Sequence, residues 1–121
     1  MAARHPAVLL VEDDARLGAM VAEYLGQHEL EVTVVPDGER GLAALRRGRF
    51  DVVLLDVMLP GMDGTELRAR MLRDANLAHI PVIVVTAAGG LVKRALPHVA
   101  AFYRKPVSLD ELVETLAEHV G

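Results

Sequence analysis

The sequence Val52-Val53-Leu54-Leu55-Asp56 runs into a loop that reads Val57-Met58-Leu59-Pro60-Gly61-Met62-Asp63-Gly64. Four consecutive apolar residues predict a short strand that is buried on both faces, as the strands of parallel sheets are. Proline and glycine then mark a loop. Asp56 is therefore expected at the carboxyl edge of a sheet, which is where α/β folds place their chemistry.

Short apolar runs and amphipathic stretches alternate along the rest of the chain. The other apolar runs cover residues 7–11, 32–35, 82–85 and 101–103. Apolar residues at helical spacing predict one helix that contains residues 17–25 and another that contains residues 109–120. Because strand and helix alternate five times, we expect a flavodoxin-like (βα)5 fold, a doubly wound parallel sheet with strand order 2-1-3-4-5.

Three helix starts carry local signals. Ser108 and Glu111 form a capping box before the last helix. Asp37-Gly38 and Gly64 predict the starts of two other helices.

Composition indicates one compact domain across residues 1–121, since 52% of the residues are hydrophobic. The net charge of −4 argues against direct nucleic-acid binding, and the five histidines lack metal-ligand spacing. There is no cysteine, so thiol chemistry is excluded. No apolar stretch approaches the ~18 residues of a membrane span, and the first residues lack the apolar core of a signal peptide. These features predict a cytoplasmic protein without membrane contact.

A cluster of acids is expected where the first and third strands end side by side. The first strand runs into Glu12-Asp13-Asp14, opposite Asp56. Carboxylates this close would repel one another unless a cation neutralised them, and hard oxygen ligands suit Mg²⁺. The alternative is that Asp14 only caps the first helix while Glu12 and Asp13 are solvated.

A hydroxyl and an ammonium group complete the predicted site. Thr86 ends the fourth strand and Lys105 follows the fifth. Each residue alone is uninformative, but with the acids they supply what phosphoryl transfer needs. Asp56 would be the nucleophile, Lys105 and Mg²⁺ would neutralise phosphoryl oxygens, and Thr86 would donate a hydrogen bond.

With these residues in place, the chain resembles the receiver domains of bacterial two-component response regulators over essentially its whole length. The resemblance rests on four motifs in family order: Val11-Glu12-Asp13-Asp14, residues 56–64, Thr86-Ala87 and Lys105-Pro106. It implies that Asp56 accepts a phosphoryl group from the phosphohistidine of a sensor histidine kinase or a histidine phosphotransfer protein.

The same resemblance implies roles for the other residues. Asp13, Asp56 and the backbone carbonyl of Met58 would bind Mg²⁺ directly, and Glu12 would bind it through water. Thr86 and Lys105 match the signalling hydroxyl and the phosphate-binding lysine.

Phe102 matches the aromatic switch position, and Thr86 moving toward the phosphoryl group would vacate space for its ring. Phosphorylation would thereby change the surface of helix four, strand five and helix five for a downstream effector protein or domain. Tyr103 should point to the opposite face, because strand side chains alternate, and should pack there with a tethered hydroxyl. The domain would be regulatory rather than an enzyme, assisting its own phosphorylation and dephosphorylation.

The segment between Thr86 and Lys105 departs from the family pattern. It is a few residues shorter than usual, and it contains Gly89-Gly90 and Pro97. We therefore expect a short or irregular fourth helix.

Three alternatives remain for comparison. A haloacid-dehalogenase-type phosphatase would need a second Asp where Met58 stands. A flavin-binding module would need a phosphate loop where the acids Glu12-Asp13-Asp14 lie. The last alternative is a non-phosphorylated receiver-like interaction domain, whose hallmark would be the loss of a site residue.

Overall fold

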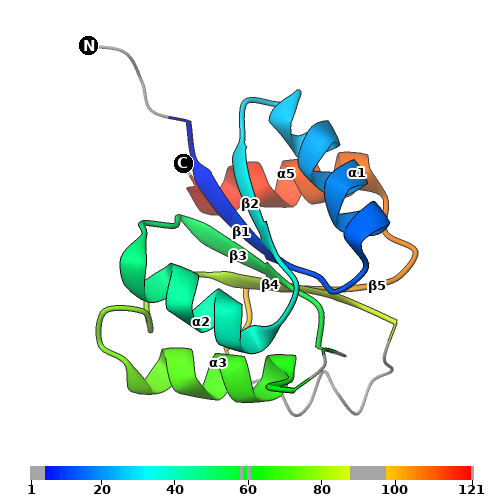
Figure 1. Ribbon diagram of the computed structural model, residues 1–121. Coiled ribbons are helices and arrows are strands. Elements are labelled where there is room, and N and C mark those ends of the chain that lie inside the picture. Colours follow the sequence, from blue (N-terminus) through cyan, green and yellow to red (C-terminus); the bar gives the residue numbers. More distant parts are fainter. Residues whose placement is uncertain (1–4, 58, 60, 88–97, 121) are drawn as a thin grey trace.

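The computed structural model describes residues 5–57, 59, 61–87 and 98–120. These residues form a five-stranded parallel sheet with helices on both faces (Figure 1). The elements in chain order are β1 (Ala7–Val11), α1 (Ala15–Gly26), β2 (Glu31–Val35), α2 (Gly38–Arg47), β3 (Val52–Leu55), α3 (Gly64–Arg73), β4 (Val82–Thr86), β5 (Ala101–Arg104) and α5 (Leu109–Val120).

The strand order is β2-β1-β3-β4-β5, and every neighbouring pair is parallel. The predicted flavodoxin-like topology is therefore confirmed. The apolar runs match β1 and β3 in their limits, and β2 begins one residue before its run. The strands β4 and β5 each extend one residue past their apolar runs, and β4 ends at Thr86 as predicted. The expected irregular fourth helix, with Gly89-Gly90 and Pro97, lies outside the described residues.

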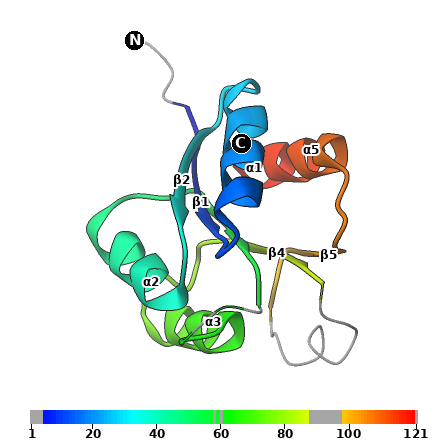
Figure 2. The same cartoon turned by 45° about the vertical axis from the view of Figure 1, so that its right-hand side comes forward.

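Helices α2 and α3 cover one face of the sheet, and α1 and α5 cover the other (Figures 1 and 2). The strands supply both cores by alternation, because successive side chains point to opposite faces. Leu9, Val53 and Val84 pack with α2 and α3, while Leu10, Leu54 and Ile83 pack with α1 and α5. The core is aliphatic, as the composition predicts.

Three helices begin at an aspartate whose side chain accepts backbone N–H groups of the first turn. Asp14, Asp37 and Asp63 cap α1, α2 and α3. Ser108 accepts the N–H of Glu111 at 3.4 Å at the start of α5. These caps confirm the predicted helix starts. Within the described part of the chain, no helix has the length and apolar character needed to cross a membrane.

Candidate functional site

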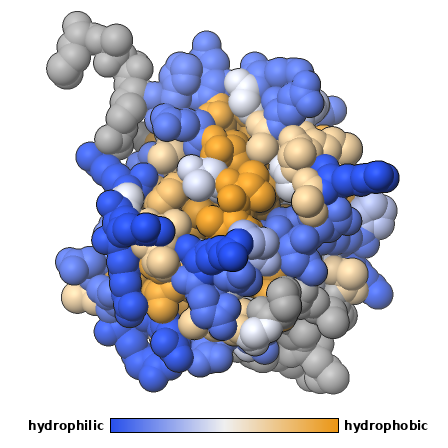
Figure 3. Space-filling model, in the orientation of Figure 1, coloured by the Kyte–Doolittle hydropathy of each residue, from blue (hydrophilic) through white to orange (hydrophobic). Residues whose placement is uncertain are grey.

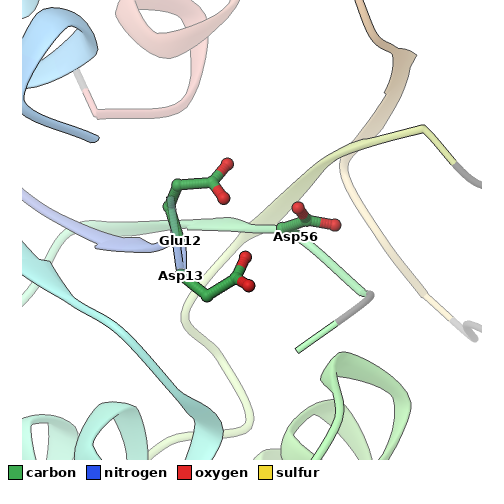
Figure 4. Close-up of side chains that lie close together, drawn as sticks. All are labelled: Glu12, Asp13 and Asp56. Atoms are coloured by element: carbon green, nitrogen blue, oxygen red, sulfur yellow. The ribbon is translucent and has the colours of Figure 1, made fainter. Parts of the chain in front are cut away.

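Three carboxylates meet where β1 and β3 end (Figure 4). Asp56 follows β3, and its N–H donates to Val11 O at 3.1 Å, which holds it beside the end of β1. Glu12 and Asp13 continue β1 past that point. One carboxylate oxygen from each of Glu12, Asp13 and Asp56 lies within 4.8 Å of the others. The structure thus brings together the three acids that the sequence placed at this edge.

Lys105 lies between two of these acids. Its Nζ donates to Glu12 Oε1 at 2.7 Å and to Asp56 Oδ2 at 2.9 Å. Burial raises the pKa of Glu12, and the hydrogen bond from Lys105 only partly opposes this effect. Burial also acts to lower the pKa of Lys105, but hydrogen bonds and charge attraction from Asp56 and Glu12 outweigh it and raise that pKa. The lysine is therefore held as a cation against two buried carboxylates.

Thr86 lies at the end of β4 beside Lys105. The N–H of Lys105 donates to Thr86 O at 2.9 Å, and the threonine is fully buried. Since side chains alternate, Thr86 shares a face with Val84, whose register partner is Phe102. Phe102 is half-buried and packs against the α2/α3 core. The two expected switch residues therefore lie on the same face of neighbouring strands.

Tyr103 packs on the opposite face, in the α1/α5 core, and its hydroxyl is hydrogen-bonded to Thr115. The prediction that Tyr103 points away from Phe102 with a tethered hydroxyl is confirmed.

The acidic triplet divides between two roles. Asp14 Oδ1 accepts the N–H groups of Arg16 and Leu17 at 3.0 and 3.1 Å, so the view that it caps α1 is correct. The accompanying view that Glu12 is solvated is wrong, because Glu12 is only 5% exposed. Asp13 is exposed. The fourth expected ligand, the carbonyl of Met58, lies outside the described residues.

The arrangement fits a hard divalent cation. All three side chains offer carboxylate oxygens, and a cation among them would relieve their mutual repulsion. Exposure of Asp13 leaves one side open to water, which suits Mg²⁺ because this ion keeps several water ligands.

Three features of the site region carry no clear signal in the sequence. A cavity of about 470 Å³ opens between α1 and α5 and reaches Glu12, Asp56 and Lys105. Glu39 at the start of α2 accepts the N–H of Met62 at 3.0 Å. Arg68 on α3 is 3% exposed and donates from Nη2 to His98 O at 2.7 Å. Each depends on packing between elements that are far apart in the chain, and periodicity does not report such packing.

Fold and site together define a class of protein: a doubly wound α/β domain with a cluster of carboxylates beside a lysine at the carboxyl edge of the sheet. The chain belongs to the response regulator receiver domain family, whose family model matches residues 8–117. It is therefore a regulatory signalling domain of the two-component type, as the sequence motifs indicate.

Individual relatives agree with this assignment. The chain is 40% identical over 112 residues to the transcriptional regulatory protein TcrA of Mycobacterium tuberculosis, covering 90% of this chain and 44% of that protein. The structure is similar to the chemotaxis protein CheY4 of Vibrio cholerae, with a TM-score of 0.85, 27% identity and coverage of 94% and 98% of the two chains.

A third relative bears on the cation. The receiver domain of sensor histidine kinase PA1611 from Pseudomonas aeruginosa has a TM-score of 0.87 and 28% identity to this chain, with 96% and 98% of the two chains covered. That structure is described as having a magnesium ion coordinated in its active-site cleft. The present chain spans less than half the length of the curated relatives it matches, such as TcrA.

Proposed function

We propose that Asp56 is the phosphoacceptor of this receiver domain. The observation that carries the proposal is the convergence of Asp56, Glu12, Asp13 and Lys105 on one point at the sheet edge. The donor would be the phosphohistidine of a sensor histidine kinase or a histidine phosphotransfer protein. A carboxylate oxygen of Asp56 would attack phosphorus as the P–N bond breaks, and the imidazole would leave with the bonding electron pair and take up a proton.

The other residues would act on the charge of the phosphoryl group. Lys105 Nζ, now 2.9 Å from Asp56 Oδ2, would pair with a phosphoryl oxygen. Thr86 would donate its hydroxyl to another. Glu12, Asp13 and Asp56, with the carbonyl of Met58, would hold Mg²⁺, which when bound supplies positive charge that offsets the charge of the phosphoryl oxygens. The same groups would assist later hydrolysis of the acyl phosphate.

Output would follow from movement of Thr86. Phe102 lies on the same face, so a shift of Thr86 toward the phosphoryl group would free space for its ring. This population shift would change the surface of helix four, β5 and α5, where a downstream effector protein or domain would bind. No direct contact with nucleic acid or membrane is proposed for this domain. Residues 1–121 would act as one receiver domain, and the proposed phosphodonors would place it in the cytoplasm.

The test is phosphorylation of Asp56→Asn by acetyl phosphate, followed by intact-mass spectrometry in the presence of Mg²⁺. We expect a phospho-adduct on the unmodified chain and none on the variant. Asp74→Asn is the matched control, since Asp74 lies after α3 at the other edge of the sheet and an Asn there still accepts the N–H of Asn76. An adduct that persists in Asp56→Asn would overturn the assignment.

A further inference from the structure

The loop that follows Asp56 is tied to the first turn of α2. Glu39 Oε1 accepts the N–H of Met62 at 3.0 Å across 23 residues of sequence. Met62 is 7% exposed, so its N–H has little access to water if the carboxylate moves away. A buried backbone donor without a partner is costly, and a charged acceptor strengthens the bond. The contact therefore pairs an exposed carboxylate with a buried backbone donor that has little access to another partner.

Two glycines make this close approach possible. Gly61 adopts φ +67°, which favours glycine, and a Cβ there would lie 3.0 Å from Glu39 Oε1. A Cβ on Gly38, next to Glu39, would lie 2.4 Å from Met62 O. The loop and the start of α2 are thus closer than larger side chains would allow, and they meet in one relative position.

The hydrogen bond between Glu39 and Met62 is connected to Asp56 by the loop between β3 and α3. Gly64 N–H donates to Val57 O at 3.0 Å, and a Cβ on Gly64 would lie 3.0 Å from Asp56 O. The loop therefore leaves Asp56 and returns against its backbone. Two contacts thus hold the described part of this loop: Gly64 N–H donates to Val57 O, and Met62 N–H donates to Glu39.

We propose that Glu39 is a positioning residue for phosphoryl transfer, which fixes the loop after Asp56 by holding Met62 N–H. This inference rests on the proposed function, since it concerns the geometry around Asp56 and the cation. Glu39 touches none of the reacting atoms. Its effect would reach Asp56 through the backbone of the loop that follows this residue.

A simpler role for Glu39 is to favour the start of α2 through its charge, because acids in the first turn interact well with the helix dipole. Two variants separate the roles. Glu39→Ala removes both the acceptor and the charge, whereas Glu39→Gln removes the charge and keeps an oxygen that can accept Met62 N–H. Glu66→Ala is the matched control, because Glu66 is the exposed acid in the first turn of α3 and its side chain pairs with Arg70 at 3.0 Å rather than with the loop.

Three quantities are measured in each variant: the exchange rate of the Met62 amide, the affinity for MgCl₂ by magnetic-resonance titration, and the rate of labelling by acetyl phosphate. For Glu39→Ala we expect faster amide exchange and a loss of about three- to tenfold in both affinity and labelling rate, in line with one lost hydrogen bond. Glu39→Gln should lose clearly less than Glu39→Ala because it keeps a neutral acceptor for Met62 N–H, and Glu66→Ala should stay within about twofold of the unmodified chain.

Either of two results would overturn the proposal. One is an unchanged affinity and labelling rate in Glu39→Ala. The other is Glu39→Gln losing as much as Glu39→Ala, which would assign the effect to charge. An unmodified chain that takes no label at Asp56 would instead refute the proposed function, and the amide exchange of Met62 distinguishes that failure, because it reports on the hydrogen bond to Glu39 without any phosphorylation.

Discussion

The two faces of the sheet are covered in different ways. Near the site, α2 and α3 press closely against the strands and the loop after β3, and a cavity of about 620 Å³ on that face lies at the opposite edge of the sheet, beside Leu45, Phe50 and Leu77. A Cβ on Gly41 of α2 would lie 3.3 Å from Val11 Cγ2, and a Cβ on Gly18 of α1 would lie 3.0 Å from Val34 Cγ1, so glycines allow close helix packing on both faces. On the other face α1 and α5 leave a cavity of about 470 Å³ that reaches the site.

The face covered by α1 and α5, which we call the open face in contrast to the closed face under α2 and α3, also exposes apolar side chains. Figure 3 shows hydrophobic residues gathered in the middle of one side of the molecule, over the region where Figure 1 places α1 and β2. Met20 on α1 and Val34 on β2 are exposed. A hydrogen bond from the hydroxyl of Tyr24 to Asp110 links α1 to α5.

The two faces therefore contribute to the site in different ways. The closed face fixes the backbone of the loop after Asp56, which the chemistry needs in one geometry. The open face leaves Glu12, Asp56 and Lys105 reachable from a cavity. Partly exposed side chains that border this cavity, such as Leu17, should therefore contribute less to stability than fully buried side chains such as Leu67.

The largest expected effect is on the closed face. Leu67 of α3 is fully buried, so Leu67→Ala should lower the free energy of unfolding by about 2–5 kcal/mol. Leu17 of α1 is only half-buried and borders the cavity, so Leu17→Ala should lower it by about 1 kcal/mol or less. Urea titrations of both variants give the two values. Equal losses would contradict the expectation that a partly exposed side chain at the cavity contributes less than a fully buried one.

A second prediction concerns the acids that the open face leaves reachable. Asp13→Asn removes an exposed carboxylate from the cluster, so Mg²⁺ affinity should fall about tenfold or more, while stability without Mg²⁺ should rise by up to about 1 kcal/mol as repulsion is relieved. Thermal melts with and without Mg²⁺ measure both effects. Asp14→Asn is the control, since it removes a neighbouring charge and keeps a good helix cap. If Mg²⁺ raised the melting temperature of Asp13→Asn as much as that of the unmodified chain, Asp13 would not be a ligand.

Most of the fold could be predicted because its signals are local. The runs of Val and Leu fix the strands, and Asp37 with Gly38 fixes the start of α2. The meeting of Glu12, Asp13 and Asp56 could be predicted as well, because the ends of neighbouring parallel strands must lie at one edge.

The features that could not be predicted from the sequence depend on how closely the helices pack against the sheet and its loops. Glu39 meets Met62 only because α2 lies against the loop, and Arg68 is buried only because α3 lies beside His98. Nothing in the local sequence distinguishes these two side chains from the other polar residues of an amphipathic helix. The cavity beside Lys105 likewise follows from how far α5 lies from α1, which side-chain volumes and loop geometry set together.

A third prediction follows from the raised pKa of Glu12. The folded chain holds this proton more tightly than the unfolded chain does, so the contribution to stability is fully present below the ordinary value of 4.5 and is lost as pH rises through the raised pKa. Without Mg²⁺, the stability of the unmodified chain relative to Glu12→Gln should therefore fall with rising pH in that window. Urea titrations across the range test this, with Glu118→Gln as a control for removing an exposed acid. A relative stability that rises with pH would contradict the sign.

The smallest expected effect is a change in stability on α1, where an exposed residue and a buried residue are neighbours. Met20 is 52% exposed although it borders the cavity, so Met20→Ala should change the free energy of unfolding by no more than about 0.5 kcal/mol. Its neighbour Val21 is 6% exposed, and Val21→Ala should lower stability by more than about 1 kcal/mol. Alanine improves helix propensity more when it replaces valine than when it replaces methionine, so propensity acts against the expected difference and cannot produce it. If Met20→Ala were the more destabilising of the two, the Met20 side chain would have to cover the cavity in solution, and the α1/α5 face would be closed rather than open.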